Sequence, residues 1–235
     1  MKSESYLVPV SIVVAGVIIA VAIFTISQKS GPVSLTPSSS PEQANLSPGA
    51  DQFKKVTEKI DVSQDPVLGT PEAKLLMIEF SDFQCPFCQR HALNAFPEIK
   101  KQYIDTGKVK LVFKNLPLPA DSPPYHKNAQ LAAEAGECAF EQNKFWEYKD
   151  KLFQDQQKLG KDDLKLSAKE LGLDSQKFDD CLDSRKYEQE VKEDLAEAQK
   201  LGIGGTPSFV IGDILVDGAY PFSTFEKIIE EKLKQ

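Results

Sequence analysis

The sequence predicts an α/β domain in which a block of helices separates the first strands from the last ones. Three observations predict this class. A helical pattern lies between two strand-like apolar runs over residues 75–119, helical spacing alone extends from about 122 to 202, and residues 207–235 fit two short strands and a helix. The chain of 235 residues is 41% hydrophobic, which is normal for a globular protein with a sizeable core.

An apolar segment precedes this domain. After a short flank of residues 1–6, residues 7–26 read LVPVSIVVAGVIIAVAIFTI and carry no charge. About 20 apolar residues are needed to cross a bilayer, so we expect a transmembrane anchor here. The alternative is a cleaved signal peptide, whose apolar core is usually about 7–15 residues long. The small residues of Ala20-Val21-Ala22 would suit cleavage, but they lie inside the apolar run.

A linker is expected between this segment and the domain. Residues 27–52 are rich in Ser and Pro and hold few large apolar side chains, so they cannot bury enough surface to fold. The folded domain is therefore assigned to residues 53–235. The net charge of −7 argues against a nucleic-acid-binding protein, which would carry a basic stripe.

The first strand–helix–strand unit contains a pair of cysteines. The apolar run LLMIEFSDF, residues 75–83, fits a buried strand that ends just before Cys85. Pro86 suits the first turn of the helix that follows, and Pro97 predicts a kink in that helix. Residues 108–119 alternate before meeting prolines and fit a second strand, which should be parallel to the first.

The rest of the domain is expected to be a helical insert followed by a hairpin and a helix. The insert covers about residues 122–202. Two short apolar runs around Gly212-Asp213 fit a β-hairpin within residues 207–218. Residues 222–235 form an amphipathic pattern and predict a C-terminal helix.

Cys85-Pro86-Phe87-Cys88 could hold a metal, close a structural disulfide or exchange electrons. Structural zinc usually takes four ligands. The chain offers one closely spaced pair of cysteines and four scattered candidates, which are Cys138, Cys181, His91 and His126. Neither remaining cysteine has a partner at short spacing, and each histidine alone fits a surface or helix-packing position. We therefore expect no metal.

The position of the pair favours redox exchange over a structural disulfide. A disulfide between Cys85 and Cys88 would close a very small loop and would restrict the unfolded chain little. Cys85 stands where a strand leads into a helix, and the positive end of the helix dipole lowers a thiol pKa there. We expect Cys85 to be the exposed, attacking cysteine and Cys88 the shielded one that resolves a mixed disulfide.

Three sequence features together resemble a known family. The stretch IEFSDFQCPFC, the helical insert and GGTPSFVIG are similar to the DsbA-like thiol–disulfide oxidoreductases, especially the membrane-anchored bacterial type. The resemblance extends from about residue 65 to the C-terminus. It implies a thioredoxin fold with an inserted all-helical domain, preceded here by the transmembrane helix and the disordered linker.

The resemblance also implies roles for several residues. Glu79 would be a buried acid that exchanges protons with Cys88, and Lys114 would be its charge partner. The Thr206–Pro207 bond would be cis and would face the cysteines, where the backbone of Thr206 could pair with a client peptide. A second, structural disulfide would join the remaining two cysteines, Cys138 and Cys181.

The expected function is to introduce disulfides into exported proteins. The family implies no cofactor, a quinone-linked membrane oxidase as partner, and a single-pass protein with its catalytic domain on the extracytoplasmic side. DsbA has histidine where this chain has Phe87, which cannot donate a hydrogen bond to a thiolate. We therefore expect a reduction potential between about −120 mV and about −270 mV. A reductase or isomerase of the same fold, or a tethered peptide-binding chaperone, are the alternatives.

Overall fold

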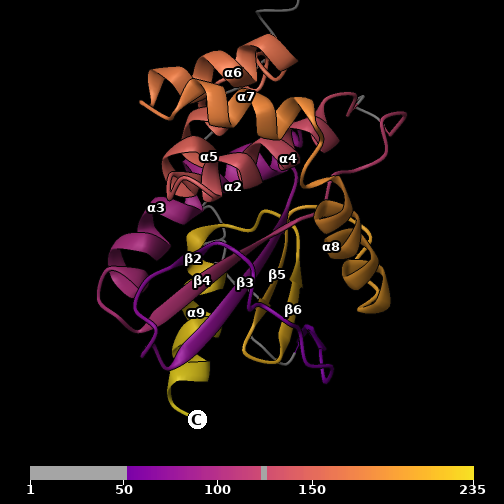
Figure 1. The fold of residues 1–235 in the computed structure, drawn as a ribbon. Coiled ribbons are helices and arrows are strands. Elements are labelled where there is room, and N and C mark those ends of the chain that lie inside the picture. The colour runs from indigo at the N-terminus through magenta and orange to yellow at the C-terminus, as the bar shows by residue number, and fades with distance from the viewer. Residues whose placement is uncertain (1–51, 123–125) are drawn as a thin grey trace, which may run out of the picture. The chain divides into compact units, whose positions relative to one another are not determined.

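A mixed six-stranded sheet forms the base of the domain in the computed structural model, which describes residues 52–122 and 126–235 (Figure 1). The strand order is β1-β6-β5-β3-β4-β2. The strands are β1 (Lys54–Lys55), β2 (Val67–Leu68), β3 (Leu75–Ser81), β4 (Val109–Asn115), β5 (Ser208–Ile211) and β6 (Ile214–Asp217). β3 and β4 are parallel, whereas every other neighbouring pair is antiparallel. The predicted parallel unit and the hairpin β5–β6 are confirmed.

The two edge strands, β1 and β2, were not predicted. Each has only two residues and pairs with one neighbour, β1 with β6 and β2 with β4. Two residues are too few to show the alternation by which a strand is found in a sequence. They extend the sheet at both edges without adding to the part that carries the cysteines.

Side chains of β3 alternate between two separate parts of the core. Met77 packs with α3 (Ala95–Ile99) and α9 (Phe222–Leu233) on one face of the sheet. Ile78 and Phe80 point to the opposite face and pack with residues from the end of α8 (Glu188–Lys200). This alternation follows from the two-residue period of a strand. It also decides which residues of β3 face the helix that contains Cys88.

The helix after Cys85 is interrupted earlier than predicted. α2 (Pro86–Leu93) is capped by Asn94, and α3 follows. A π-helical turn, η2 (Lys100–Ile104), completes the segment. The break therefore lies one turn before Pro97. A proline has no N–H to donate to the carbonyl four residues earlier, here that of Leu93, and its ring clashes with that carbonyl. The expected kink exists, but it falls at Asn94.

Five helices form the predicted insert. They are α4 (Ala129–Phe140), α5 (Phe145–Gln154), α6 (Lys161–Glu170), α7 (Ser175–Asp183) and α8. Figure 1 shows α6 and α7 farthest from the sheet, with α4 and α5 between them and the sheet and with α8 beside it. A Cβ atom at Gly136 would lie 3.2 Å from the Phe83 ring, so glycine lets α4 approach the loop before Cys85 closely.

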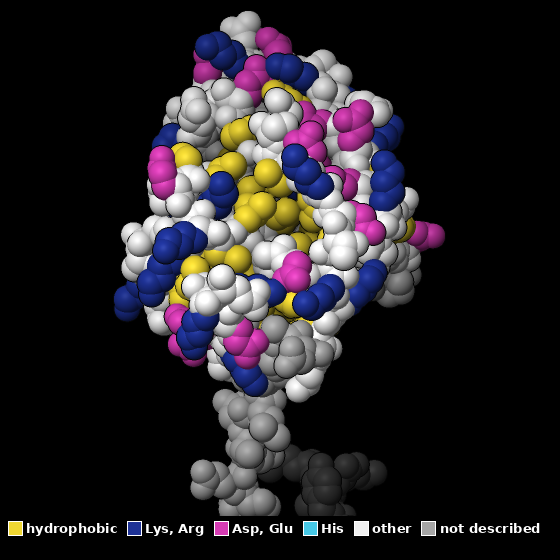
Figure 2. Space-filling model, turned by 90° about the horizontal axis from the view of Figure 1, so that it is seen from below, with side chains coloured by type: hydrophobic (Ala, Val, Ile, Leu, Met, Phe, Trp, Pro, Cys, Tyr) yellow, Lys and Arg dark blue, Asp and Glu magenta, His cyan; other side chains and the backbone are white. Residues whose placement is uncertain are grey.

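The end of the domain opposite the insert carries charges of both signs. Figure 2 shows apolar side chains gathered in a hollow there, ringed by Lys and Arg intermixed with Asp and Glu. The side chains described on this face therefore make no continuous basic patch. None of the described helices is both long and apolar enough to cross a bilayer. The expected anchor, residues 7–26, and nearly all of the linker lie outside the described residues.

Candidate active site

Cys85 stands at the N-terminus of α2, as the sequence predicts. The turn after β3 is held by Asp82, whose side chain accepts a hydrogen bond from the Gln84 N–H at 2.7 Å. The N–H of Cys85 donates to the Asp82 carbonyl at 3.1 Å, and α2 begins at the next residue, Pro86. The chain thus places the Cys85 sulfur at a helix end with free backbone N–H groups.

Both cysteines are free thiols and both are buried. The exposed fraction is 2% for Cys85 and 0% for Cys88. The expectation of an exposed Cys85 is therefore wrong for this conformation. The Cys85 thiol donates to the carbonyl of Thr206 at 3.4 Å, and the Gln156 amide donates to the carbonyl of Cys85 at 2.9 Å. The loop before β5 approaches Cys85, as the resemblance implied, and a segment of the insert at Gln156 does so as well, which was not predicted.

The two thiols have opposite electrostatic environments. A hydrogen bond from the Cys88 thiol is the main reason why the pKa of Cys85 falls to about 6. The side chain of Thr206 and the backbone N–H groups of Phe87 and Cys88 add to this effect, while burial opposes it. Burial raises the pKa of Cys88 well above its usual value, and the proximity of Cys85 raises it further. One sulfur is therefore prepared as a thiolate nucleophile and the other is held as a thiol.

This difference predicts a titration of the reduced protein. We expect the ultraviolet absorbance of a thiolate to appear with a midpoint at about pH 6 in the reduced full chain and to be missing from Cys85→Ser. The lowered pKa belongs to the folded state, so ionisation of Cys85 stabilises the folded protein. This contribution to the free energy of unfolding is fully present above the ordinary thiol pKa of about 8.5 and is lost as the pH falls through the folded value of about 6. A midpoint near that ordinary value would contradict the lowered pKa.

The loop before β5 faces the cysteines. The Thr206–Pro207 peptide bond is cis, which confirms this part of the prediction, and β5 begins at Ser208. The carbonyl of Thr206 is the group that accepts from Cys85. The binding of a client peptide to the backbone of Thr206 stays a prediction.

Glu79 is a buried acid on the face of β3 that α2 covers. Its exposed fraction is 0%, and among the described residues neither carboxylate oxygen has a hydrogen-bond partner. Burial raises the pKa of this carboxyl, and the charge of Lys149 from α5 opposes the rise. Ser81 lies two residues along the strand, on the same face, and its side chain acts to lower the pKa of Cys88 against the larger effect of burial. Burial therefore favours the protonated form of Glu79, and its proton exchange with Cys88 stays a prediction.

The predicted pairing of Lys114 with Glu79 is wrong. In the β3–β4 register Lys114 stands opposite Phe80, whereas Glu79 stands opposite Phe113. Lys114 therefore points to the other face of the sheet. Its ammonium group forms ion pairs there with Asp65 at 2.9 Å, Asp194 at 2.9 Å and Glu197 at 3.1 Å. It ties the segment before β2 to α8 instead of acting on the cysteines.

The two histidines occupy different buried sites. His126 forms a 2.7 Å contact through Nδ1 with the carboxylate of Asp82, at the turn before Cys85. His91, three residues after Cys88, has no hydrogen-bond partner on either ring nitrogen within the described part of the chain, and burial lowers its pKa to about 3. Across residues 52–122 and 126–235 no group of three or more His, Cys, Asp or Glu side chains is arranged to hold a metal.

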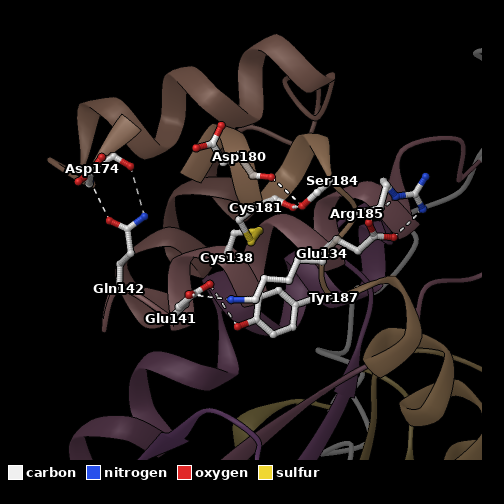
Figure 3. Close-up of a disulfide and its surroundings, with 11 residues drawn as sticks. Glu134, Cys138, Glu141, Gln142, Asp174, Asp180, Cys181, Ser184, Arg185 and Tyr187 are labelled. Carbon is white, nitrogen blue, oxygen red and sulfur yellow. Dashed lines mark hydrogen bonds and ion pairs between the residues drawn. A yellow bond between two sulfur atoms is a disulfide. The ribbon is translucent and has the colours of Figure 1, made fainter. Parts of the chain in front are cut away.

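A disulfide joins Cys138 of α4 to Cys181 of α7, as expected (Figure 3). The two residues are 43 positions apart, and their Cα atoms lie 5.9 Å from each other. Both helices belong to the insert, and Cys138 lies in the same apolar cluster as Cys85 and Cys88. The bond therefore stabilises the helical layer that covers the thiols.

Comparisons with known proteins agree with this geometry. The family model described as Thioredoxin matches residues 61–231. Probable disulfide bond formation protein D of Bacillus cereus is 33% identical over 195 residues, which cover 79% of this chain and 86% of that protein. Disulfide bond formation protein D of Bacillus subtilis is 27% identical over 187 residues, covering 76% of this chain and 82% of that protein.

Solved structures show the same fold. Oxidised BdbD from Bacillus subtilis superposes with a TM-score of 0.67 at 26% identity, covering 77% of this chain and 100% of that one. Wolbachia pipientis alpha-DsbA1 gives a TM-score of 0.65 at 25% identity, covering 74% and 94% of the two chains. The fold is therefore a thioredoxin fold with a helical insertion. The chain belongs to the thioredoxin family and is a DsbA-like thiol–disulfide oxidoreductase.

Proposed function

We propose that this protein introduces disulfides into exported proteins and that Cys85-Pro86-Phe87-Cys88 is its redox couple. The observation that carries the proposal is the contrast between the two thiols. The pKa of Cys85 is lowered to about 6, whereas that of Cys88 is raised. A stabilised thiolate favours the reduced form of the couple, so the oxidised form is a good donor of disulfides.

The reaction has two exchange steps. A client thiolate attacks the Cys85 sulfur of the Cys85–Cys88 disulfide, which forms a mixed disulfide and releases Cys88 as a thiolate. Cys88 then takes a proton from the neighbouring buried acid, Glu79. A second client thiolate attacks the client's own sulfur, which releases the oxidised client and leaves Cys85 as a thiolate. The backbone of Thr206 and the cis bond to Pro207 would hold the client during both steps.

The reduced enzyme must be reoxidised before it can act again. We propose a quinone-linked membrane oxidase as the partner, with the protein held as a single-pass membrane protein by residues 7–26 and the catalytic domain outside the cytoplasm. The sequence supports this arrangement through its uncharged apolar segment and the Ser- and Pro-rich linker. The Cys138–Cys181 disulfide also suits an oxidising compartment.

The reduction potential of the couple tests the direction of the reaction. We expect a value above about −200 mV and below about −120 mV when the full chain is equilibrated in glutathione buffers. Alkylation and mass mapping would separate Cys85 and Cys88 from the disulfide of the insert. A value at or below about −270 mV would reject the oxidase and favour a reductase or isomerase of the same fold.

A further inference from the structure

Lys149 is a buried lysine that the predicted site did not include. It lies on α5, in the helical insert, and its exposed fraction is 0%. Its Nζ atom lies 4.1 Å from the centroid of the Phe96 ring and 5.3 Å from that of Phe153. Among the described residues its nearest carboxylate oxygen is that of Asp150, at 3.5 Å, and that side chain is 57% exposed. A buried ammonium with so weak an ion pair needs another source of negative charge.

Glu79 is the complementary group. It is equally buried, and its two carboxylate oxygens lack hydrogen-bond partners in the part of the chain that the structure describes. It stands between Phe113 of β4 and Phe209 of β5 in the sheet, and the His91 ring of α2 lies 4.4 Å from the Phe209 ring. The pKa of Glu79 is raised by burial and lowered by the charge of Lys149. The carboxyl of β3 and the ammonium of α5 are thus both buried in the layer beneath α2.

The other groups in this layer supply little compensating charge. The charged side chains that act on Glu79 are Lys149, which favours the carboxylate, and the exposed Asp150, which weakly opposes it. α2 contributes His91, whose pKa is lowered by burial so that it is neutral, and the Cys88 thiol. β3 contributes the uncharged hydroxyl of Ser81. Lys149 is therefore the cation on which the ionised form of Glu79 depends.

We propose that Lys149 is a positioning residue for the exchange reaction: it stabilises the Glu79 carboxylate that exchanges a proton with Cys88. The helical insert would then set the protonation of the buried acid, in addition to covering the thiols. This inference rests on the proposed proton exchange between Glu79 and Cys88. It replaces Lys114, which lies on the other face of the sheet, as the charge partner.

The step that depends on Lys149 can be isolated in a mixed disulfide of Cys85 with glutathione. Cys88 gives its proton to the Glu79 carboxylate, and its sulfur attacks Cys85. The bond between Cys85 and glutathione breaks, and glutathione leaves as a thiolate that takes a proton from water. The two protein sulfurs end as a disulfide, and glutathione is reduced. The rate of glutathione release should follow the ionisation of Glu79.

The substitution Lys149→Met in the full chain removes the charge and keeps an unbranched apolar side chain. We expect the pKa of Glu79, followed by carbon-13 NMR of labelled carboxyl groups in the reduced protein, to rise by about one unit or more. The pH midpoint of glutathione release should rise by the same amount. Lys149→Gln, which is less apolar, should give the same shift and provides a second variant if Lys149→Met does not fold.

Two further variants separate this role from a merely structural one. Lys151→Met removes a lysine of the same helix that is paired with Glu170 at 2.6 Å and should change neither midpoint. In a Glu79→Gln background, adding Lys149→Met should produce no further shift in glutathione release. An unchanged pKa of Glu79 in Lys149→Met, or an equal kinetic shift with and without the Glu79 carboxylate, would overturn the proposal.

The same data distinguish failure of this inference from failure of the proposed function. The titration of Glu79 needs no client protein and no particular direction of electron flow. A reduction potential typical of a reductase would therefore reject the oxidase while leaving the effect of Lys149 measurable. A normal oxidase potential with an unshifted Glu79 would reject only the role of Lys149.

Discussion

Replacing Cys85 with serine is expected to reduce the catalysed oxidation of a reduced test protein to the uncatalysed rate. In the proposed reaction the client attacks the sulfur of Cys85, and a serine oxygen cannot form the mixed disulfide. The environment that lowers the pKa of Cys85 to about 6 cannot produce a thiolate when the side chain has no thiol. The measurement is the recovery of activity of a reduced, unfolded enzyme that needs disulfides, incubated with the full chain.

Cys88→Ser is the matched control for this experiment. It keeps the Cys85 sulfur but removes the thiol that resolves a mixed disulfide. When glutathione disulfide first oxidises Cys85 to its mixed disulfide with glutathione, a client thiolate displaces glutathione, and covalent complexes between Cys85 and the client should accumulate and be detected on non-reducing gels. Cys85→Ser should form none. Unchanged oxidation in Cys85→Ser would contradict the redox role of Cys85 and would favour a tethered chaperone that binds unfolded chains.

The sequence predicted the features that depend on local pattern. The parallel strands, the helical insert and the last hairpin follow from apolar spacing that is visible within each segment. Cys85 at the start of α2 and Pro86 after it also follow from neighbouring residues, because a strand leading into a helix places these positions together. The cis bond before Pro207 was implied by the resemblance to a family, and no local pattern would have indicated it.

The missed features depend on how distant segments meet. Lys114 was paired with the wrong group because a strand sequence does not give its register, and one residue of slip moves a side chain to the other face. Lys149 had only the pattern of a helical lysine, and its burial follows from the packing of α5 against α2 and α3. His126 and Asp82, which are in contact, lie 44 positions apart in the sequence, and the residues around neither of them indicate this contact.

The site is formed by side chains from both parts of the domain, the sheet with α2 and the helical insert. The sheet and α2 supply the two cysteines and Glu79, while the insert supplies Gln156 against the Cys85 carbonyl and Lys149 beside the acid. An insertion that only covered the cysteines would need apolar side chains alone. The polar and charged groups that this insert directs at the site fit the proposed role of Lys149, by which the insert also sets the protonation of Glu79.

Removing the disulfide of the insert is expected to destabilise the folded domain by roughly 4 kcal/mol, because closing a loop between residues 43 positions apart restricts the unfolded chain. Other contacts hold α4 near α7 in the folded state. Arg185 donates two hydrogen bonds to Glu134 at 2.5 and 2.6 Å, and the Asp174 N–H donates to the Gln142 side chain at 2.8 Å (Figure 3). The folded structure should therefore persist without the bond, and the loss should arise mainly in the unfolded state.

The measurement compares thermal unfolding in a background that has only this disulfide, Cys85→Ala/Cys88→Ala, with and without the further substitutions Cys138→Ala and Cys181→Ala. The melting temperature should fall by about 10 °C in the variant that lacks the bond. Chemical reduction of the background protein should give a similar fall, which separates the cross-link from the loss of two sulfur atoms in a buried site. Equal melting temperatures before and after reduction would show that the bond restricts an unfolded chain that is already compact, and the entropic account would then be wrong.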